Sequence, residues 1–142
     1  MIVLDTTVLV YAVGSDHPLR EPCRELIAAI AAGRLRATTT VEVLQEFTHV
    51  RARRRGPEDA VGFARDYLDV LAPLVVVGED DLQAGLRLYA RSERIGAFDA
   101  VLAATASRVN ATAMVSADGA FAEADVPHVV PDADGVAALL SS

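Results

Sequence analysis

Short aliphatic runs alternate along the chain with longer segments whose apolar residues recur at helical spacing. The runs predict buried strands, expected at residues 2–4, 35–38, 74–77, 113–115 and 129–130. The longer segments predict helices, expected at residues 18–32, 40–55, 58–71, 80–91, 98–109 and 133–140. Short aliphatic strands that alternate with helices indicate an α/β domain with a mainly parallel sheet.

One carboxylate follows the first expected strand directly and lies within an otherwise apolar run. Asp5 comes after Ile2–Leu4, and no lysine or arginine lies in the first 19 residues. Burying an unpaired carboxylate is costly, so an isolated charge here requires a partner. In parallel sheets, ligands bind beyond the carboxyl ends of the strands, which is the position of Asp5.

Two further acids occupy positions that have both an ordinary and a functional interpretation. Asp118 lies three residues beyond Val115, although an Asp-Gly pair is also typical of a turn. Asp99 lies near the start of a helix, where the helix dipole favours an acid. If that helix begins at or before Ala97, however, the carboxylate shares a face with apolar residues and requires compensation. Both interpretations remain open for each residue.

The helix expected at 40–55 contains two acids, Glu42 and Glu46. A rotation of about 100° per residue places Glu46 at the margin of the apolar stripe and Glu42 farther toward solvent. Glu46 and His49 resemble one half of a carboxylate-bridged metal site, but the required second copy is missing. We therefore expect Glu46 to reach a cleft and His49 to be structural.

Composition narrows the classes of function. A length of 142 residues predicts a single domain spanning 1–142, and the net charge of −7 argues against broad neutralisation of phosphates. Such a charge is compatible with a site that meets phosphates through a metal ion. The mean hydropathy of +0.30 hints at a buried subunit or partner surface. Four arginines cluster near the end of one helix and could face RNA, a protein partner or solvent. They are Arg51, Arg53, Arg54 and Arg55.

Other chemistry is disfavoured. The three histidines fit no zinc spacing, and no phosphate-binding or nucleophile-elbow motif is present. The single cysteine, Cys23, is expected to be a packed helix residue, which fits a reducing cytoplasm. Asp80 and Asp81 are expected to cap a helix. No apolar run approaches the length of a membrane span, and the N-terminus lacks the pattern of a signal peptide.

Taken in order, the four acids Asp5, Glu46, Asp99 and Asp118 resemble those of PIN-domain nucleases, specifically the VapC toxins of bacterial toxin–antitoxin pairs. The segments that carry the resemblance are DTTVL, QEF, FDAVLAATA and VSADGAF. The similarity extends over nearly the whole chain. Ser116 stands where threonine is common, which retains the hydroxyl, and Gly119 follows Asp118 where a larger residue is usual.

The resemblance implies a three-layer α/β/α domain with strand order 3-2-1-4-5 and the four acids together at one end of the sheet. It implies an endoribonuclease dependent on Mg²⁺, with Mn²⁺ as a substitute, that leaves 5′-phosphate and 3′-hydroxyl ends. Asp5, Asp99 and Asp118 would bind metal directly or through water. Glu46 would be a further ligand or would orient the attacking water, and Thr6 and Ser116 would hold the acids by hydrogen bonds.

The resemblance also implies partners: a VapB-type antitoxin, an RNA substrate that could be transfer, ribosomal or messenger RNA, and a second copy of the chain. A homodimer, and a heterotetramer or larger assembly with antitoxin, are therefore expected. One alternative is a PIN-type RNA-binding or scaffold module without catalysis. A second is a receiver-like phosphotransfer module, which the absence of lysine disfavours.

Overall fold

The computed structural model describes all residues, 1–142, and its centre is a four-stranded sheet with the order β2-β1-β3-β4. Every strand pair is parallel, as the aliphatic runs predicted. The strands are β1 (Ile2–Leu4), β2 (Ala37–Thr38), β3 (Ala113–Val115) and β4 (His128–Val129). Because parallel strands are covered on both faces, the residues of β1 are at most 1% exposed.

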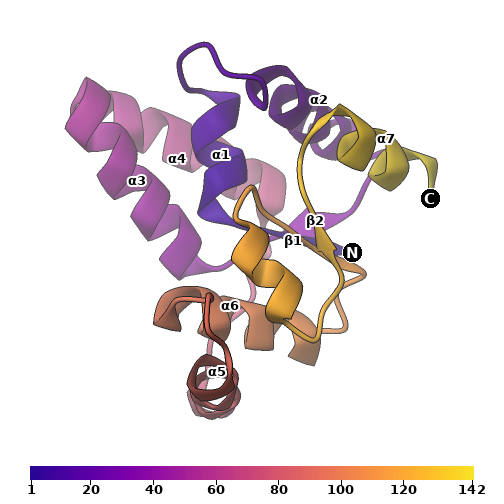
Figure 1. Ribbon diagram of the computed structural model, residues 1–142. Coiled ribbons are helices and arrows are strands. Elements are labelled where there is room, and N and C mark those ends of the chain that lie inside the picture. Colours follow the sequence, from indigo (N-terminus) through magenta and orange to yellow (C-terminus); the bar gives the residue numbers. More distant parts are fainter.

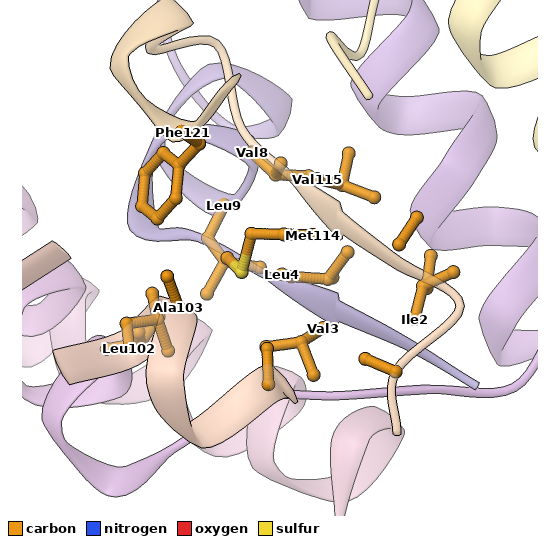
Figure 2. Packing of buried hydrophobic residues seen from close by; sticks show 14 of the residues in the cluster. Ile2, Val3, Leu4, Val8, Leu9, Leu102, Ala103, Met114, Val115 and Phe121 are labelled. Carbon is orange, nitrogen blue, oxygen red and sulfur yellow. The ribbon is translucent and has the colours of Figure 1, made fainter. Parts of the chain in front are cut away.

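Helices cover both faces of the sheet, which gives the three-layer architecture (Figure 1). In this view, α5 and α6 lie below the sheet, α1, α2 and α7 lie above it, and α3 and α4 pair beside α1. The helices are α1 (Thr6–Ala12), α2 (Arg20–Ala31), α3 (Val41–Arg55), α4 (Pro57–Leu71), α5 (Glu79–Arg91), α6 (Ala97–Arg108), the 3-10 helix η1 (Gly119–Glu123) and α7 (Ala133–Ser141). Figure 2 shows the side chains of β1 and β3 packed together with those of α6. No helix has the length and apolar character that crossing a bilayer requires.

The helix α1 was not predicted from the sequence. Its β-branched residues, such as Thr6 and Val8, have low helix propensity, and the segment has no acidic first turn or basic last turn. Tertiary contacts stabilise it instead. The Tyr67 hydroxyl donates to the Leu9 carbonyl (2.8 Å), and Arg24 donates to the carbonyl of Ala12 (2.9 Å) at the helix end. Contacts from α2 and α4 therefore override the local preference.

The expected strand at 74–77 is not formed, and this prediction was wrong. Only one bridge connects this segment to the sheet, between Val75 and Thr40, with the Val75 N–H donating to Thr39 (2.9 Å). The neighbouring strand β2 is two residues long and α3 begins at Val41, so a longer partner strand has nothing to pair with. The bridge lies on the outer side of β2, as the order 3-2-1-4-5 requires of a third strand. The ends of the remaining predicted helices lie within about two residues of their expected positions.

The helices α5 and α6 approach each other closely because α5 carries a glycine at their contact. A Cβ atom on Gly85 would lie 2.7 Å from the Cα of Val101, so no larger residue fits without a shift of the backbone. An ion pair joins the same two helices: Arg108 donates to both oxygens of Asp81 at 2.7 and 3.0 Å. Asp81 also accepts from the Gly78 N–H (3.0 Å), which confirms its predicted role in capping α5.

Arg108→Gln is expected to lower the free energy of unfolding at pH 7, because it leaves the buried Asp81 carboxylate without its charged partner. The Arg108 guanidinium holds the pKa of Asp81 below its usual value, so the pair stabilises the fold above about pH 4. This contribution is lost as the pH falls through the lowered pKa. Urea unfolding at pH 7 and pH 3 measures both effects, with Arg87→Gln, an exposed arginine without an ion pair, as the control. Equal loss of stability in the two variants at pH 7 would contradict the assignment.

Candidate functional site

The four acids predicted from the sequence line one cavity of about 520 Å³. Asp5 lies between β1 and α1, Glu46 lies on α3, Asp99 is in the first turn of α6, and Asp118 precedes η1. The Asp5 N–H donates to the carbonyl of Val115 (3.0 Å), which continues the pairing of β1 with β3 by one residue. The carboxyl edge of the sheet therefore brings together residues separated by more than a hundred positions.

Asp5 is buried, with 5% exposure, and two hydroxyls satisfy one of its oxygens. Its Oδ2 accepts from Ser116 at 2.6 Å and from Thr7 at 3.0 Å. Oδ1 accepts no hydrogen bond from the protein. The hydrogen bond expected of Ser116 is thus present, whereas the part played by Thr7 was missed.

Glu46 and Asp118, like Asp5, each have one carboxylate oxygen that accepts a protein hydrogen bond and one that does not. Glu46 Oε2 accepts from the Thr6 hydroxyl at 3.0 Å, as the resemblance implied. Asp118 Oδ1 accepts from the Ala120 N–H at 2.9 Å, which makes Asp118 the cap of η1 as well as a residue of the cavity. Asp118 therefore lies at a turn, as its ordinary interpretation predicts, and its side chain also lines the cavity. In each carboxylate the second oxygen has no protein donor.

Asp99 differs from the other three because neither of its oxygens accepts a protein hydrogen bond. The helix α6 begins at Ala97, so the carboxylate lies beside apolar positions of its own helix, as expected for that start. Burial raises the pKa of Asp99 to about 6, with further increases from the nearby charges of Asp5, Asp118 and Glu46 in that order. Perturbation by burial together with like charges in a cleft is typical of functional carboxylates.

The arrangement has a net excess of negative charge that a cation would offset. No group of three or more acidic, histidine or cysteine side chains is placed so that all could hold one ion directly. Carboxylate oxygens without protein donors are hard ligands of the kind that Mg²⁺ and Mn²⁺ bind, and Mg²⁺ usually retains several waters. The donor set therefore fits a hydrated divalent cation better than an ion enclosed by protein ligands alone.

The arginine cluster divides into three environments. Arg51 is bound within the fold: it pairs with Asp59 at 2.5 Å, donates to the Val13 carbonyl at 2.9 Å and lies over the ring of Phe63. Arg54 lines the acidic cavity. Arg53 and Arg55 are exposed and lie outside this cavity. The sequence presented these residues as one patch, but the guanidinium of Arg51 is already occupied within the chain.

Several other residues near the site were not singled out from the sequence. Tyr11 and His17 line the cavity as a stacked pair, with ring centroids 4.3 Å apart. The His128 ring contacts the Ser116 carbonyl (Nε2 to O, 2.9 Å) from the outer strand β4. Since these histidines are far apart in sequence and fit no metal spacing, only the tertiary fold identifies them. Cys23 is buried, and burial raises the pKa of its thiol to about 12, in agreement with a packing role.

The sequence of the chain matches a known protein family. The PIN domain family matches residues 2–127. The chain belongs to the PIN-domain family. It is 54% identical to ribonuclease VapC7 of Mycobacterium tuberculosis over 145 residues, with 99% of this chain and 98% of the relative covered. Ribonuclease VapC23 of the same species is 32% identical, with 87% and 98% covered. The chain is therefore a PIN domain of the VapC group, and the receiver-like alternative is wrong.

Solved structures agree on the PIN fold. VapC20 of M. tuberculosis, described as a toxin that cleaves the sarcin–ricin loop, matches with a TM-score of 0.73 at 20% identity over 86% of this chain and 93% of the other. FitAcB from Neisseria gonorrhoeae matches with a TM-score of 0.74 at 19% identity, over 92% and 98%. VapBC2 from Rickettsia felis, solved with a promoter DNA fragment, matches with a TM-score of 0.72 at 20% identity, over 92% and 98%. At these identities the likeness concerns the fold.

Proposed function

We propose that this PIN domain is a metal-dependent endoribonuclease and the toxin of a toxin–antitoxin pair. One observation carries the proposal: Asp5, Glu46 and Asp118 each have one carboxylate oxygen held by the protein and one left free, around Asp99. Holding one oxygen fixes the carboxylate while the other remains available to a ligand. The 54% identity to a named ribonuclease supports catalysis over a scaffold without activity.

Mg²⁺, with Mn²⁺ as a substitute, fits the donor set, and Asp5, Asp99 and Asp118 would hold it directly or through water. When bound, such an ion lowers the pKa of a water and offsets charge on the phosphate oxygens. Since three ligands do not converge on one position, at least part of this coordination is expected to pass through water.

The side chains of the chain have separate tasks in the proposed hydrolysis. The free oxygen of Glu46 would orient the attacking water and accept its proton, with Thr6 fixing the carboxylate at 3.0 Å. Attack on phosphorus breaks the bond to the 3′ oxygen, which leaves with a proton from solvent. The products are a 5′-phosphate and a 3′-hydroxyl. Ser116 and Thr7 keep Asp5 in place, and Asp99 supplies negative charge where a cation is needed.

The proposed function also implies partners. A VapB-type antitoxin fits an acidic cavity that a basic side chain could fill, and solved structures of the fold include VapBC2 of R. felis and FitAB bound to DNA. We also propose a homodimer, a heterotetramer or larger assembly with antitoxin, and a cytoplasmic location. Exposed apolar side chains on α5, among them Leu82, Leu86 and Tyr89, support an interface between protein chains.

The experiment is cleavage of total cellular RNA by the purified protein, with sequencing of the new ends. We expect cleavage with Mg²⁺, none with EDTA and recovery when Mg²⁺ or Mn²⁺ is added back. The products should carry 5′-phosphates, which ligate directly to an adaptor. Cleavage that continues in EDTA, or products with 2′,3′-cyclic phosphates, would overturn the proposal. The sites cut also identify the class of RNA.

A further inference from the structure

The cavity described above is a groove between α1 and α3, and the four acids lie at one end of it. On α3, the lining residues Glu46, Val50 and Arg54 recur at every fourth position, so they form one stripe along the helix. At 1.5 Å per residue, Arg54 lies about 12 Å along the axis from Glu46. On α1, the lining extends in the same way from Thr6 at the acidic end to Tyr11 near the other end. The groove therefore extends well beyond the four carboxylates.

The end of the groove away from the acids has an aromatic surface. The rings of Tyr11 and His17 stack with centroids 4.3 Å apart and an interplanar angle of 27°. His17 is exposed, and its Nδ1 accepts the Leu19 N–H at 3.1 Å, which fixes the orientation of the ring. An ordered aromatic ring that faces a groove is a suitable surface for stacking a nucleobase.

The same end carries an arginine without a protein partner. Arg54 makes no ion pair or hydrogen bond, in contrast to Arg51 one turn earlier, which is bound to Asp59. Asp16, in the loop after α1, also lines this end, and its carboxylate repels a negatively charged ligand. Such a ligand is therefore favoured on the α3 side of the groove, at Arg54. One free guanidinium and one aromatic pair match the two chemical parts of a nucleotide.

We propose that the groove between α1 and α3 binds single-stranded RNA next to the cleaved bond, with a phosphate on Arg54 and a base on the Tyr11–His17 pair. This inference rests on the proposed function for its ligand. The separation of about 12 Å exceeds one phosphodiester linkage, so the contact is made by a nucleotide beyond the cleaved bond. Aromatic stacking tolerates any base, whereas Arg54 reads only the backbone. The groove thus contributes to the affinity for RNA and to the position of the strand relative to the four acids, and less to the choice of base sequence.

The first test measures binding of a fluorescein-labelled pool of random 12-nucleotide single-stranded RNA by anisotropy, in Mg²⁺ and in an Asp99→Asn background that suppresses cleavage. Adding Arg54→Gln is expected to weaken binding and to lower the slope of log affinity against log salt by about 0.7, the value for one phosphate contact on a single strand. Adding His17→Ala is expected to weaken binding about fivefold or more with the slope unchanged. Arg53→Gln, the adjacent exposed arginine outside the groove, is the matched control and should have little effect.

The second test compares cleavage of random RNA pools of 4, 8 and 12 nucleotides by the protein with Asp99 intact. The Arg54→Gln variant should show a raised KM on the longer pools with kcat nearly unchanged, while Arg53→Gln matches the unsubstituted protein. If Arg54→Gln and Arg53→Gln bind RNA equally and have equal KM values, the inference is overturned even if the protein cuts RNA. That result is expected of a groove that binds the antitoxin and not the RNA. Absence of cleavage by the unsubstituted protein refutes the proposed function. In that case the difference in RNA binding between Arg54→Gln and Arg53→Gln still tests whether the groove binds RNA.

Discussion

Replacing Asp99 with Asn is expected to reduce RNA cleavage by roughly 10³-fold and, in the same protein, to stabilise the metal-free fold. Activity falls because Asp99 is the one acid of the four that accepts no protein hydrogen bond. Both of its oxygens are therefore free to bind a cation. A loss of several kcal/mol of transition-state stabilisation corresponds to roughly 10³-fold in rate. Stability rises because Asn removes a partly buried charge that Asp5, Asp118 and Glu46 repel.

The gain in stability has a defined dependence on pH. The pKa of Asp99 is about 6 in the folded chain and about 3.9 in an unfolded one, so ionisation costs stability as the pH rises through this interval. Below about pH 4 the carboxyl is protonated in both states, and Asn has no advantage. Above about pH 6 the advantage is complete, at about 2 kcal/mol once partial exposure is allowed for. Urea unfolding in EDTA at pH 4 and pH 7.5 measures it.

Asp66→Asn provides the matched control for Asp99→Asn. Asp66 is exposed on α4 and makes no hydrogen bond or ion pair, so the substitution makes the same change in net charge away from the site. It should leave cleavage and stability nearly unchanged. Stability of Asp99→Asn that equals the unsubstituted protein at pH 7.5 would show that the four charges do not repel as described. Cleavage within a few-fold of the unsubstituted protein would remove Asp99 from the proposed machinery.

The convergence of the four acids on one cavity was more predictable from the sequence than the complete set of helices and strands was. Asp5 could be identified because a buried parallel strand leaves its next residue at the edge where ligands bind, whatever the lengths of the other strands. Asp118 and Asp99 were ambiguous because a turn residue or a helix N-terminal acid occurs often without function. Both lie in the cavity, and Asp118 is also a cap, so the ordinary and functional interpretations are compatible.

The failures have a common physical cause, which is that tertiary contacts decided the outcome. The helix α1 forms in a β-branched segment because Tyr67 and Arg24 satisfy its carbonyls from other helices. The segment 74–77 has an aliphatic strand pattern, but only Val75 finds a partner. Arg51 appeared equivalent to its neighbours until Asp59 and Phe63 were placed beside it. Local patterns carry no information about such partners.

Ser116→Ala is expected to reduce kcat or the affinity for Mg²⁺ by about 10- to 100-fold, although Ser116 would touch neither metal nor RNA. Its hydroxyl is fully buried and joins two acids: it donates to Asp5 Oδ2 at 2.6 Å and accepts the Asp118 N–H at 3.0 Å. Without it, Asp5 retains only the Thr7 donor, and the Asp118 N–H loses its acceptor. The unfolding free energy should also fall, by about 1–2 kcal/mol.

A double-mutant cycle separates positioning by Ser116 from a purely structural role. If Ser116 acts by holding the Asp5 carboxylate, Ser116→Ala should have little further effect on cleavage when Asp5→Asn is already present, while its effect on stability persists. Ser116→Thr retains the hydroxyl and should restore Mg²⁺ affinity measured by titration calorimetry. Thr6→Val, which removes the donor to the exposed Glu46, should leave that affinity closer to normal. Only a hydroxyl that holds Asp5 makes the effects of Ser116→Ala and Asp5→Asn on cleavage depend on each other. Fully additive losses of cleavage in the cycle would therefore assign Ser116 to stability alone. A folded Ser116→Thr variant that does not regain Mg²⁺ affinity would lead to the same conclusion.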